Sequence, residues 1–247
     1  MAPKIALQLY TLRELTKADY EGIVRKVAAM GYEGVETAGF DGTTVPAAAK
    51  LFKELGLTVV GAHSPFPIGE QKNEVLDVSS AFGCKYMVVP HIGPNDTKDM
   101  DSIKDLCARI NEASVNAKER GMTLAIHNHW WEYHILEGKL VADWMVEMID
   151  PTVLFELDTY WIKVGGVDPA VRVAQIGKRA PIIHIKDGPG VREAAQTAIG
   201  TGIMDFPAIL KAGGANTEWW IMEADRVDGD AVEAARQSCD YMRGLVK

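Results

Sequence analysis

The chain has 247 residues, 47% of them hydrophobic, and a formal net charge of −8 at neutral pH. This length and composition suffice for one large core, so we expect a single domain over residues 1–247, whereas the acidic balance disfavours nucleic acid as a partner. No run approaches the roughly 20 apolar residues that span a bilayer, and no secretory signal pattern opens the sequence, so we expect a cytoplasmic protein without a membrane partner.

Eight apolar runs of strand length recur along the chain and alternate with helical patterns. The runs are Ile5–Tyr10, Gly34–Thr37, Thr58–His63, Tyr86–His91, Met122–His127, Val153–Asp158, Ile182–Ile185 and Trp219–Glu223. Helical spacing of apolar residues appears between them at Tyr20, Ile23, Val24 and Val27, at Ile103, Leu106, Cys107 and Ile110, at Val141, Trp144, Met145 and Met148, and in the segment from Asp230 to Val246. Eight strands are the number that a closed parallel barrel requires, so the pattern predicts an α/β fold, a (β/α)8 TIM barrel.

Glycines support this alternation. Gly31, Gly56 and Gly121 each stand between a helical pattern and the next apolar run, the position of a left-handed helix end. An open doubly wound sheet is the alternative fold, but it usually carries a glycine-rich phosphate turn after its first strand. No such turn follows Tyr10, so the sequence favours the barrel.

Polar side chains gather at the ends of the later strands. They are His127, His129, Asp158, His184 and Glu223. In TIM barrels the carboxyl ends of the strands and the loops after them form the catalytic face. Because side chains alternate along a strand, residues two apart, such as Glu156 and Asp158, point the same way. The pattern therefore predicts a divalent-metal site at this end of the barrel.

The βα units, together with the segments 156–169, 182–188 and 221–225, resemble the xylose-isomerase-like TIM-barrel superfamily, the sugar phosphate isomerase/epimerase group. The resemblance covers the whole chain and is most specific in its second half. It implies a divalent metal held by a glutamate, an aspartate, a histidine and a second glutamate at the ends of strands five to eight. By strand order, the last three ligands fall on Asp158, His184 and Glu223.

The fifth strand departs from the family pattern, because His127 stands where the glutamate is usual and His129 and Glu132 follow it. Strand order favours His127 as the ligand, while a looped-back Glu132 would better preserve oxygen ligation. Cys84, Cys107 and Cys239 form no CxxC pair, so neither a disulfide framework nor a thiolate site is expected. Mixed oxygen and nitrogen ligands suit Mn²⁺, Mg²⁺, Co²⁺ or Zn²⁺, with Mn²⁺ favoured.

A divalent ion in such a site can bind a sugar carbonyl and hydroxyl and stabilise the enediolate that forms on proton loss. Glu223 and Glu132 are the candidate bases, and His129 is a further candidate catalytic residue. Lys186 is a candidate for steadying an oxyanion, although a lysine in an ordinary salt bridge is an equal alternative.

The expected substrate-binding residues are two histidines that end the third and fourth runs, His63 and His91, and three tryptophans that follow the polar clusters, Trp130, Trp131 and Trp161. The tryptophans are suited to covering an apolar face of a sugar, and packing between loop and helix explains any one of them equally well. Glu36, near the end of the second run, is a further candidate contact at this end of the barrel.

These features favour a metal-dependent isomerase or epimerase that acts on a sugar or keto-sugar through an enediolate. A metal-dependent lyase or dehydratase of a keto-inositol or 3-keto sugar is the alternative, because the same enediolate can expel a β-hydroxyl group. A DNA-repair enzyme like endonuclease IV is disfavoured, since Trp161 stands where that branch has a histidine and the chain is acidic. A non-catalytic sugar-binding barrel is the fourth reading.

We expect a small sugar or keto-sugar as the partner. The sequence leaves open whether the protein forms a homo-oligomer. Two glycine-rich stretches, 188–190 and 200–202, follow the seventh run, where many barrels hold phosphate. A glycine-rich lid is the simpler interpretation of these stretches, so the sequence leaves open whether the sugar is phosphorylated.

Overall fold

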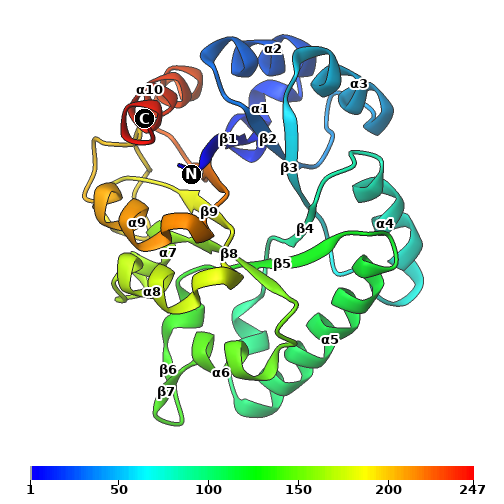
Figure 1. Ribbon diagram of the computed structural model, residues 1–247, viewed down its shortest axis with the longest axis vertical. Helices are drawn as coiled ribbons and strands as arrows, with labels where there is room; N and C mark the ends of the chain where they lie inside the picture. Colours follow the sequence, from blue (N-terminus) through cyan, green and yellow to red (C-terminus); the bar gives the residue numbers. More distant parts are fainter. Residues whose placement is uncertain (1) are drawn as a thin grey trace.

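Figure 1 shows the computed structural model, which describes residues 2–247 and closes eight strands into a barrel. Around the barrel the strands lie in the order β1, β10, β9, β8, β5, β4, β3 and β2. Their bounds are β1 Lys4–Gln8, β2 Gly34–Ala38, β3 Thr58–His63, β4 Tyr86–Val89, β5 Thr123–His127, β8 Leu154–Asp158, β9 Ile182–Ile185 and β10 Trp219–Met222. Every neighbouring pair is parallel, which confirms the predicted (β/α)8 TIM barrel.

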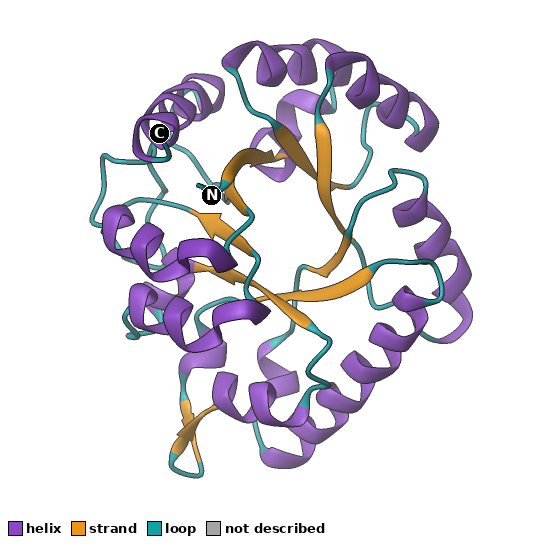
Figure 2. Cartoon of the chain, in the orientation of Figure 1, coloured by secondary structure: helices purple, strands orange, loops and turns teal. Residues whose placement is uncertain are grey.

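Helices connect the barrel strands and lie outside the ring that the strands form (Figure 2). The α-helices are α1 Arg13–Thr16, α2 Tyr20–Met30, α3 Val45–Leu55, α4 Lys72–Ser80, α5 Met100–Lys118, α6 Val141–Met148, α7 Thr159–Val164, α8 Pro169–Ile176, α9 Phe206–Gly213 and α10 Ala231–Leu245. The 3₁₀ helices are η1 Leu9–Leu12, η2 Gly69–Gln71, η3 Pro94–Thr97, η4 Trp131–Tyr133, η5 Gly177–Arg179 and η6 Gly214–Asn216. Within residues 2–247, none of these helices is both long and apolar enough to cross a bilayer.

Two strands end two residues earlier than their apolar runs predicted. The first run is strand only to Gln8, whose side chain accepts a hydrogen bond from Tyr10 N at 3.0 Å and so caps η1. The fourth run is strand only to Val89, because Pro90 has no N–H to donate to the ladder. Tyr10 and His91 therefore stand on the segments that follow these two strands.

An antiparallel hairpin, β6 Ile135–Leu136 with β7 Lys139–Leu140, precedes α6 and was not predicted. Its turn places Glu137 at φ 50° and Gly138 at φ 80°, the left-handed conformations of a tight hairpin turn. The hairpin projects away from the barrel (Figure 1). Trp144 Nε1 donates to Leu136 O at 3.0 Å and so attaches it to α6.

Alternate strand residues face the barrel interior and form an apolar cluster of their own. Its members are Ala6, Val60, Tyr86, Val88, Ala125, Ile182, Trp219 and Ile221. The residues between them, such as Leu7 and Ile183, join the larger core beneath the helices. Further along the strands the same interior positions become polar, because Ile182 is followed by His184 and Lys186. The interior is thus apolar below and polar at the carboxyl ends, where such barrels carry their active sites.

Candidate active site

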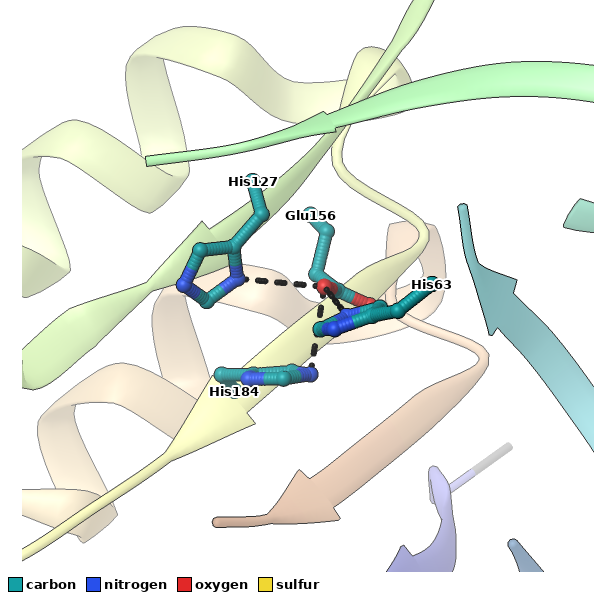
Figure 3. Close-up of side chains that lie close together, drawn as sticks. All are labelled: His63, His127, Glu156 and His184. Carbon is teal, nitrogen blue, oxygen red and sulfur yellow. Dashed lines mark hydrogen bonds and ion pairs between the residues drawn. The ribbon is translucent and has the colours of Figure 1, made fainter. Parts of the chain in front are cut away.

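Glu156 of β8 lies at the centre of a buried group of histidines. Its Oε2 atom is 3.0 Å from His63 Nε2, 3.1 Å from His127 Nδ1 and 3.2 Å from His184 Nε2. Figure 3 shows the three rings, from β3, β5 and β9, gathered around this one carboxylate. The three imidazoles therefore share a single acceptor inside the barrel.

Glu36 of β2 completes this arrangement from the opposite side of the barrel. Its Oε2 accepts a hydrogen bond from Gln8 Nε2 at 2.8 Å and lies 2.7 Å from His184 Nε2 and 3.1 Å from His63 Nε2. Both glutamates are fully buried. We call Glu36, His63 and Glu156 the inner group.

The other ring nitrogens of the two central histidines face a second set of carboxylates nearer the strand ends. His184 Nδ1 lies 2.7 Å from Glu223 Oε2, and His127 Nε2 lies 3.7 Å from Asp158 Oδ2. One ligand atom from each of these four residues lies within 4.8 Å of the others. We call His127, Asp158, His184 and Glu223 the rim group; they are the four residues that the sequence predicted as metal ligands.

Asp158 is held in place by its backbone neighbours. Its Oδ1 accepts a hydrogen bond from Trp161 N at 2.9 Å and caps α7, while Asp158 N donates to Asn128 Oδ1 at 3.0 Å. Asn128 Nδ2 returns a hydrogen bond to Asp158 O at 3.2 Å. These bonds join the ends of β5 and β8 and leave Oδ2 as the free oxygen of the carboxylate.

Lys186 lies fully buried beside the rim group. Its Nζ atom is 2.9 Å from Asp158 Oδ2, 2.8 Å from Glu223 Oε2 and 2.6 Å from Asp225 Oδ2. Burial alone would lower the pKa of Lys186, but the surrounding carboxylates of Asp158, Asp225 and Glu223 raise it well above its usual value. The side chain is therefore an ammonium ion among three acids.

The pKa values of Glu223 and Asp158 are shifted in opposite directions in this site. Burial would raise the pKa of Glu223, but Lys186 and His184 hold it well below its ordinary value. Burial does raise the pKa of Asp158, against the opposing charges of Lys186 and His127. Of these two side chains, Glu223 is therefore the one whose lowered pKa favours the ionised carboxylate.

The rim group fits a divalent cation. Five carboxyl groups surround Lys186, His63 and His184 in this site, those of Glu36, Glu156, Asp158, Glu223 and Asp225. Asp158 Oδ2 accepts no hydrogen bond, although it faces Lys186. In metal sites the second ring nitrogen of a ligand histidine usually donates to a carboxylate, and Glu156 and Glu36 offer that acceptor here. A second combination, His63, His127, Glu156 and His184, has similar spacing, but its glutamate oxygen already receives three imidazole contacts.

A cavity of about 340 Å³ lies next to the rim group. Its lining residues are Tyr10, Ala38, Gly39, His63, Pro90, His91, His127, His129, Glu223 and Asp225. The predicted contacts His63 and His91 are therefore both in the wall, and Glu223 joins the cavity to the rim group. A small polar molecule bound in this cavity would lie beside the four predicted metal ligands.

His129 stands on one wall of the cavity as a neutral ring. Burial and the neighbouring cationic groups lower its pKa far below the usual value, and its Nδ1 has no hydrogen-bond partner. The ring stacks on Trp131 with centroids 4.3 Å apart, and Trp161 lies behind it at 6.4 Å. Trp130 packs on Trp161 at 4.7 Å, so the three tryptophans support His129 rather than lining the cavity themselves.

Glu132 is not among the residues whose ligand atoms gather in the rim group. It is buried in η4, where its Oε2 accepts a hydrogen bond from His129 N at 3.0 Å. It lines a small separate cavity of about 20 Å³ with Arg172 and Tyr133, and burial raises its pKa to about 8. The fifth-strand side chain that reaches the rim group is thus His127, and a catalytic role for Glu132 stays a prediction.

Gln8, Tyr10 and Asn128 belong to the site and were not singled out from the sequence. Gln8 had a usable signal, because it is a polar residue between two leucines at the end of an apolar run. Tyr10 had none, since only the early end of β1 brings it to the cavity. Asp225 also lines the cavity.

The family model described as xylose isomerase-like TIM barrel matches residues 24–245, so the chain belongs to this family. Among solved structures, a sugar phosphate isomerase/epimerase from Parabacteroides distasonis is 26% identical, has a TM-score of 0.84 and covers 99% of this chain and 100% of its own. No curated protein matches the chain.

Two more distant structures show the same fold with different named activities. A D-allulose 3-epimerase from Methylomonas sp. is 16% identical, with a TM-score of 0.73 over 99% of this chain and 98% of its own. The structure described as the probable 3-DHS dehydratase of Bacillus anthracis is 13% identical, with a TM-score of 0.76 over 97% of this chain and 98% of its own. The same fold therefore occurs in a structure described as an epimerase and in one described as a probable dehydratase.

Proposed function

We propose that this protein is a metal-dependent isomerase or epimerase of a sugar or keto-sugar. One observation carries the proposal: the ligand atoms of the rim group lie within 4.8 Å of one another beside an accessible cavity. The similarity to a sugar phosphate isomerase/epimerase along the full chain supports the same class of reaction.

His127, Asp158, His184 and Glu223 would hold the cation through two imidazole nitrogens and two carboxylate oxygens, a mixed set that suits Mn²⁺ first and then Mg²⁺, Co²⁺ or Zn²⁺. A bound divalent ion supplies positive charge that polarises a carbonyl and lowers the cost of negative charge on its oxygen. Glu156 and Glu36 then fix the orientation of the two imidazoles from the inner side.

Glu223 is the candidate base for the carbon-bound proton. Its carboxylate is ionised, it lines the cavity, and Lys186 Nζ holds one of its oxygens at 2.8 Å. Lys186 is fully buried and does not line the cavity, so we expect its charge to act on the substrate through Glu223. His129 offers an unpartnered Nδ1 on another part of the wall, and this neutral ring nitrogen can form a hydrogen bond with a substrate hydroxyl group.

A lyase or dehydratase is the second candidate, and His127 is the observation that favours it. The family resemblance implies two metal-bound glutamates that flank the substrate and exchange protons, whereas here an imidazole occupies the fifth-strand position. Glu223 is consequently the one rim carboxylate that lines the cavity. A single base that returns the abstracted proton to the departing β-hydroxyl group is sufficient for the loss of water.

The experiment begins with metal analysis of the purified protein, followed by a mass-resolved screen against ketoses and keto-inositols. An isomerase or epimerase conserves the substrate mass, and a dehydratase releases one water. Asp158→Asn retains an oxygen for the α7 cap, so it should fold and yet lose both metal and turnover. Full turnover by Asp158→Asn, or by metal-free protein, would overturn the proposal.

A further inference from the structure

We propose that the substrate of this site is an unphosphorylated sugar. The inference rests on the proposed function and narrows its substrate class. It begins with the loop between β9 and α9, whose glycine-rich stretches occupy the place where many barrels bind phosphate.

The backbone N–H groups of this loop converge as they would on a phosphate, but an internal carboxylate occupies the point of convergence. Asp187 Oδ1 accepts from Gly188 N at 2.9 Å and from Met204 N at 3.2 Å. Its Oδ2 accepts from Gly200 N and Gly202 N, each at 2.9 Å. All four donors are therefore used by an anion that the chain itself supplies.

The loop is also packed too closely to admit another group. Asp187 is 1% exposed, and a Cβ atom added at Gly202 would overlap both the Asp187 carboxylate and the Gly188 backbone. This close approach explains why glycine stands at position 202. The glycine-rich stretches hence serve to enclose Asp187, and a phosphate group has no place among them.

The wall of the main cavity offers a phosphate no lysine or arginine side chain. Among residues 2–247, the acids that line this cavity are Glu223 and Asp225, and neither a lysine nor an arginine lines it. The buried ammonium of Lys186 is already matched by three carboxylates. Two acids near a phosphate dianion cost binding energy, whereas sugar hydroxyls can donate to the same carboxylates.

Within the described residues 2–247, the arginines in the adjoining spaces already have partners. Arg109 lines a neighbouring groove that shares His63, Pro90 and His91 with the main cavity, but Arg109 pairs with Asp96 and Asp105. The space beside the β9–α9 loop holds the acids Asp228, Asp230 and Glu233.

Arg13 lies in a further cavity that shares Asp225 with the main one. Its guanidinium donates to two backbone carbonyls, Tyr10 O at 2.8 Å and Asp225 O at 2.7 Å. Arg226 lines the same cavity and donates to Glu193 O at 2.9 Å. This cavity also contains the acids Glu14, Asp225 and Asp230, so its two arginines give it no excess of positive charge.

The test compares two matched pairs on metal-loaded protein: D-fructose with D-fructose 6-phosphate, and D-ribulose with D-ribulose 5-phosphate. Isothermal titration calorimetry measures binding, and mass-resolved product analysis measures turnover. We expect each free ketose to bind at least about tenfold more tightly than its phosphate ester, because the described part of this site leaves no lysine, arginine or free backbone N–H group available to the phosphate. Tighter binding of the ester in either pair would overturn the inference.

Arg13→Gln is the control for a phosphate subsite, since Arg13 is the arginine nearest in the chain to the cavity wall at Tyr10. The ratio of the affinity for the free ketose to the affinity for its phosphate ester should be the same in Arg13→Gln and in wild type. A selective loss of ester binding in this variant would show a subsite and contradict the inference. Preference for the free sugars without any turnover would overturn the proposed function while supporting this inference, so the two failures are distinguishable.

Discussion

His127 and His184 each use both ring nitrogens, one toward the rim carboxylates and one toward the inner group. An imidazole can ligate a metal only through a nitrogen that carries no proton, so the carboxylate on the other side decides which nitrogen is free. Glu156 provides that acceptor for His127, and Glu36 and Glu156 provide it for His184. Glu36 and Glu156 thus position the ligand histidines and do not line the cavity themselves.

Glu156→Gln tests this positioning role. An amide is a weaker acceptor than a carboxylate and cannot balance the charge of the imidazoles, so metal affinity should fall by roughly 10- to 100-fold. Titration calorimetry with Mn²⁺ measures the change. Glu147→Gln, at an exposed carboxylate on α6, is the matched control and should bind Mn²⁺ like wild type. Equal affinities in all three proteins would contradict the role of Glu156.

His63 should make the stability of the metal-free protein depend on pH. Burial alone would lower the pKa of His63, but Glu36 and Glu156 outweigh it and raise the pKa to about 10. A histidine with a raised folded pKa gives stability that is complete below its unfolded pKa of about 6.5 and is lost as the pH rises toward about 10.

Urea unfolding of His63→Asn and wild type over this pH range measures the effect. Wild type should lose free energy of unfolding relative to the variant as the pH rises from about 6.5 to about 10. Replacement of the exposed His134 by asparagine is the control and should follow wild type. Parallel pH curves for His63→Asn and wild type would show that the imidazole is uncharged in the folded protein.

At the scale of single residues, the sequence predicts the rim group better than the inner group. The rim ligands end strands, and their two-residue spacing and order along the chain both point to one end of a barrel. Glu36 and Glu156 lie within strands, where a carboxylate has no sequence feature that distinguishes an acceptor for histidine from a surface charge. Only the closure of the barrel brings β2 opposite β8 and β9 and reveals their common partners.

Among the elements, β3 and β9 have the bounds that the apolar runs predict, whereas β1 and β4 are shorter. Strand length is set by where the ladder stops, and a cap by Gln8 or the missing donor of Pro90 is a local event inside an apolar run. The β6–β7 hairpin escaped prediction because its strands have two residues each and its turn begins with a glutamate instead of asparagine or glycine.

The hairpin turn offers a prediction about stability. Glu137 has φ 50°, a conformation that costs an ordinary side chain energy and that asparagine tolerates better. Glu137→Asn should therefore raise the free energy of unfolding by a few tenths to about 1 kcal/mol in urea denaturation. Gly138→Ala is the opposed control, because Gly138 has φ 80° and open space around it, and it should destabilise by about 1 kcal/mol. A lower free energy of unfolding for Glu137→Asn than for Gly138→Ala would refute the argument.

For the whole molecule, the excess of buried carboxylates links metal binding to folding. A cation at 100 times its dissociation constant stabilises the folded state by about 2.7 kcal/mol. For a chain of this size, chelation with EDTA should then lower the melting temperature by roughly 5–10 °C. Differential scanning calorimetry checks this, with Asp158→Asn as the control that should show no shift. A wild-type melting temperature unchanged by EDTA would mean that the carboxylates are balanced without a cation.

The account depends most on where a cation binds, and anomalous diffraction from crystals soaked in Mn²⁺ measures this directly. We predict one peak bounded by His127 Nε2, Asp158, His184 Nδ1 and Glu223. A peak among His63, Glu156 and the inner nitrogens of His127 and His184, or no peak in the barrel, would contradict the proposed metal site and the function built on it.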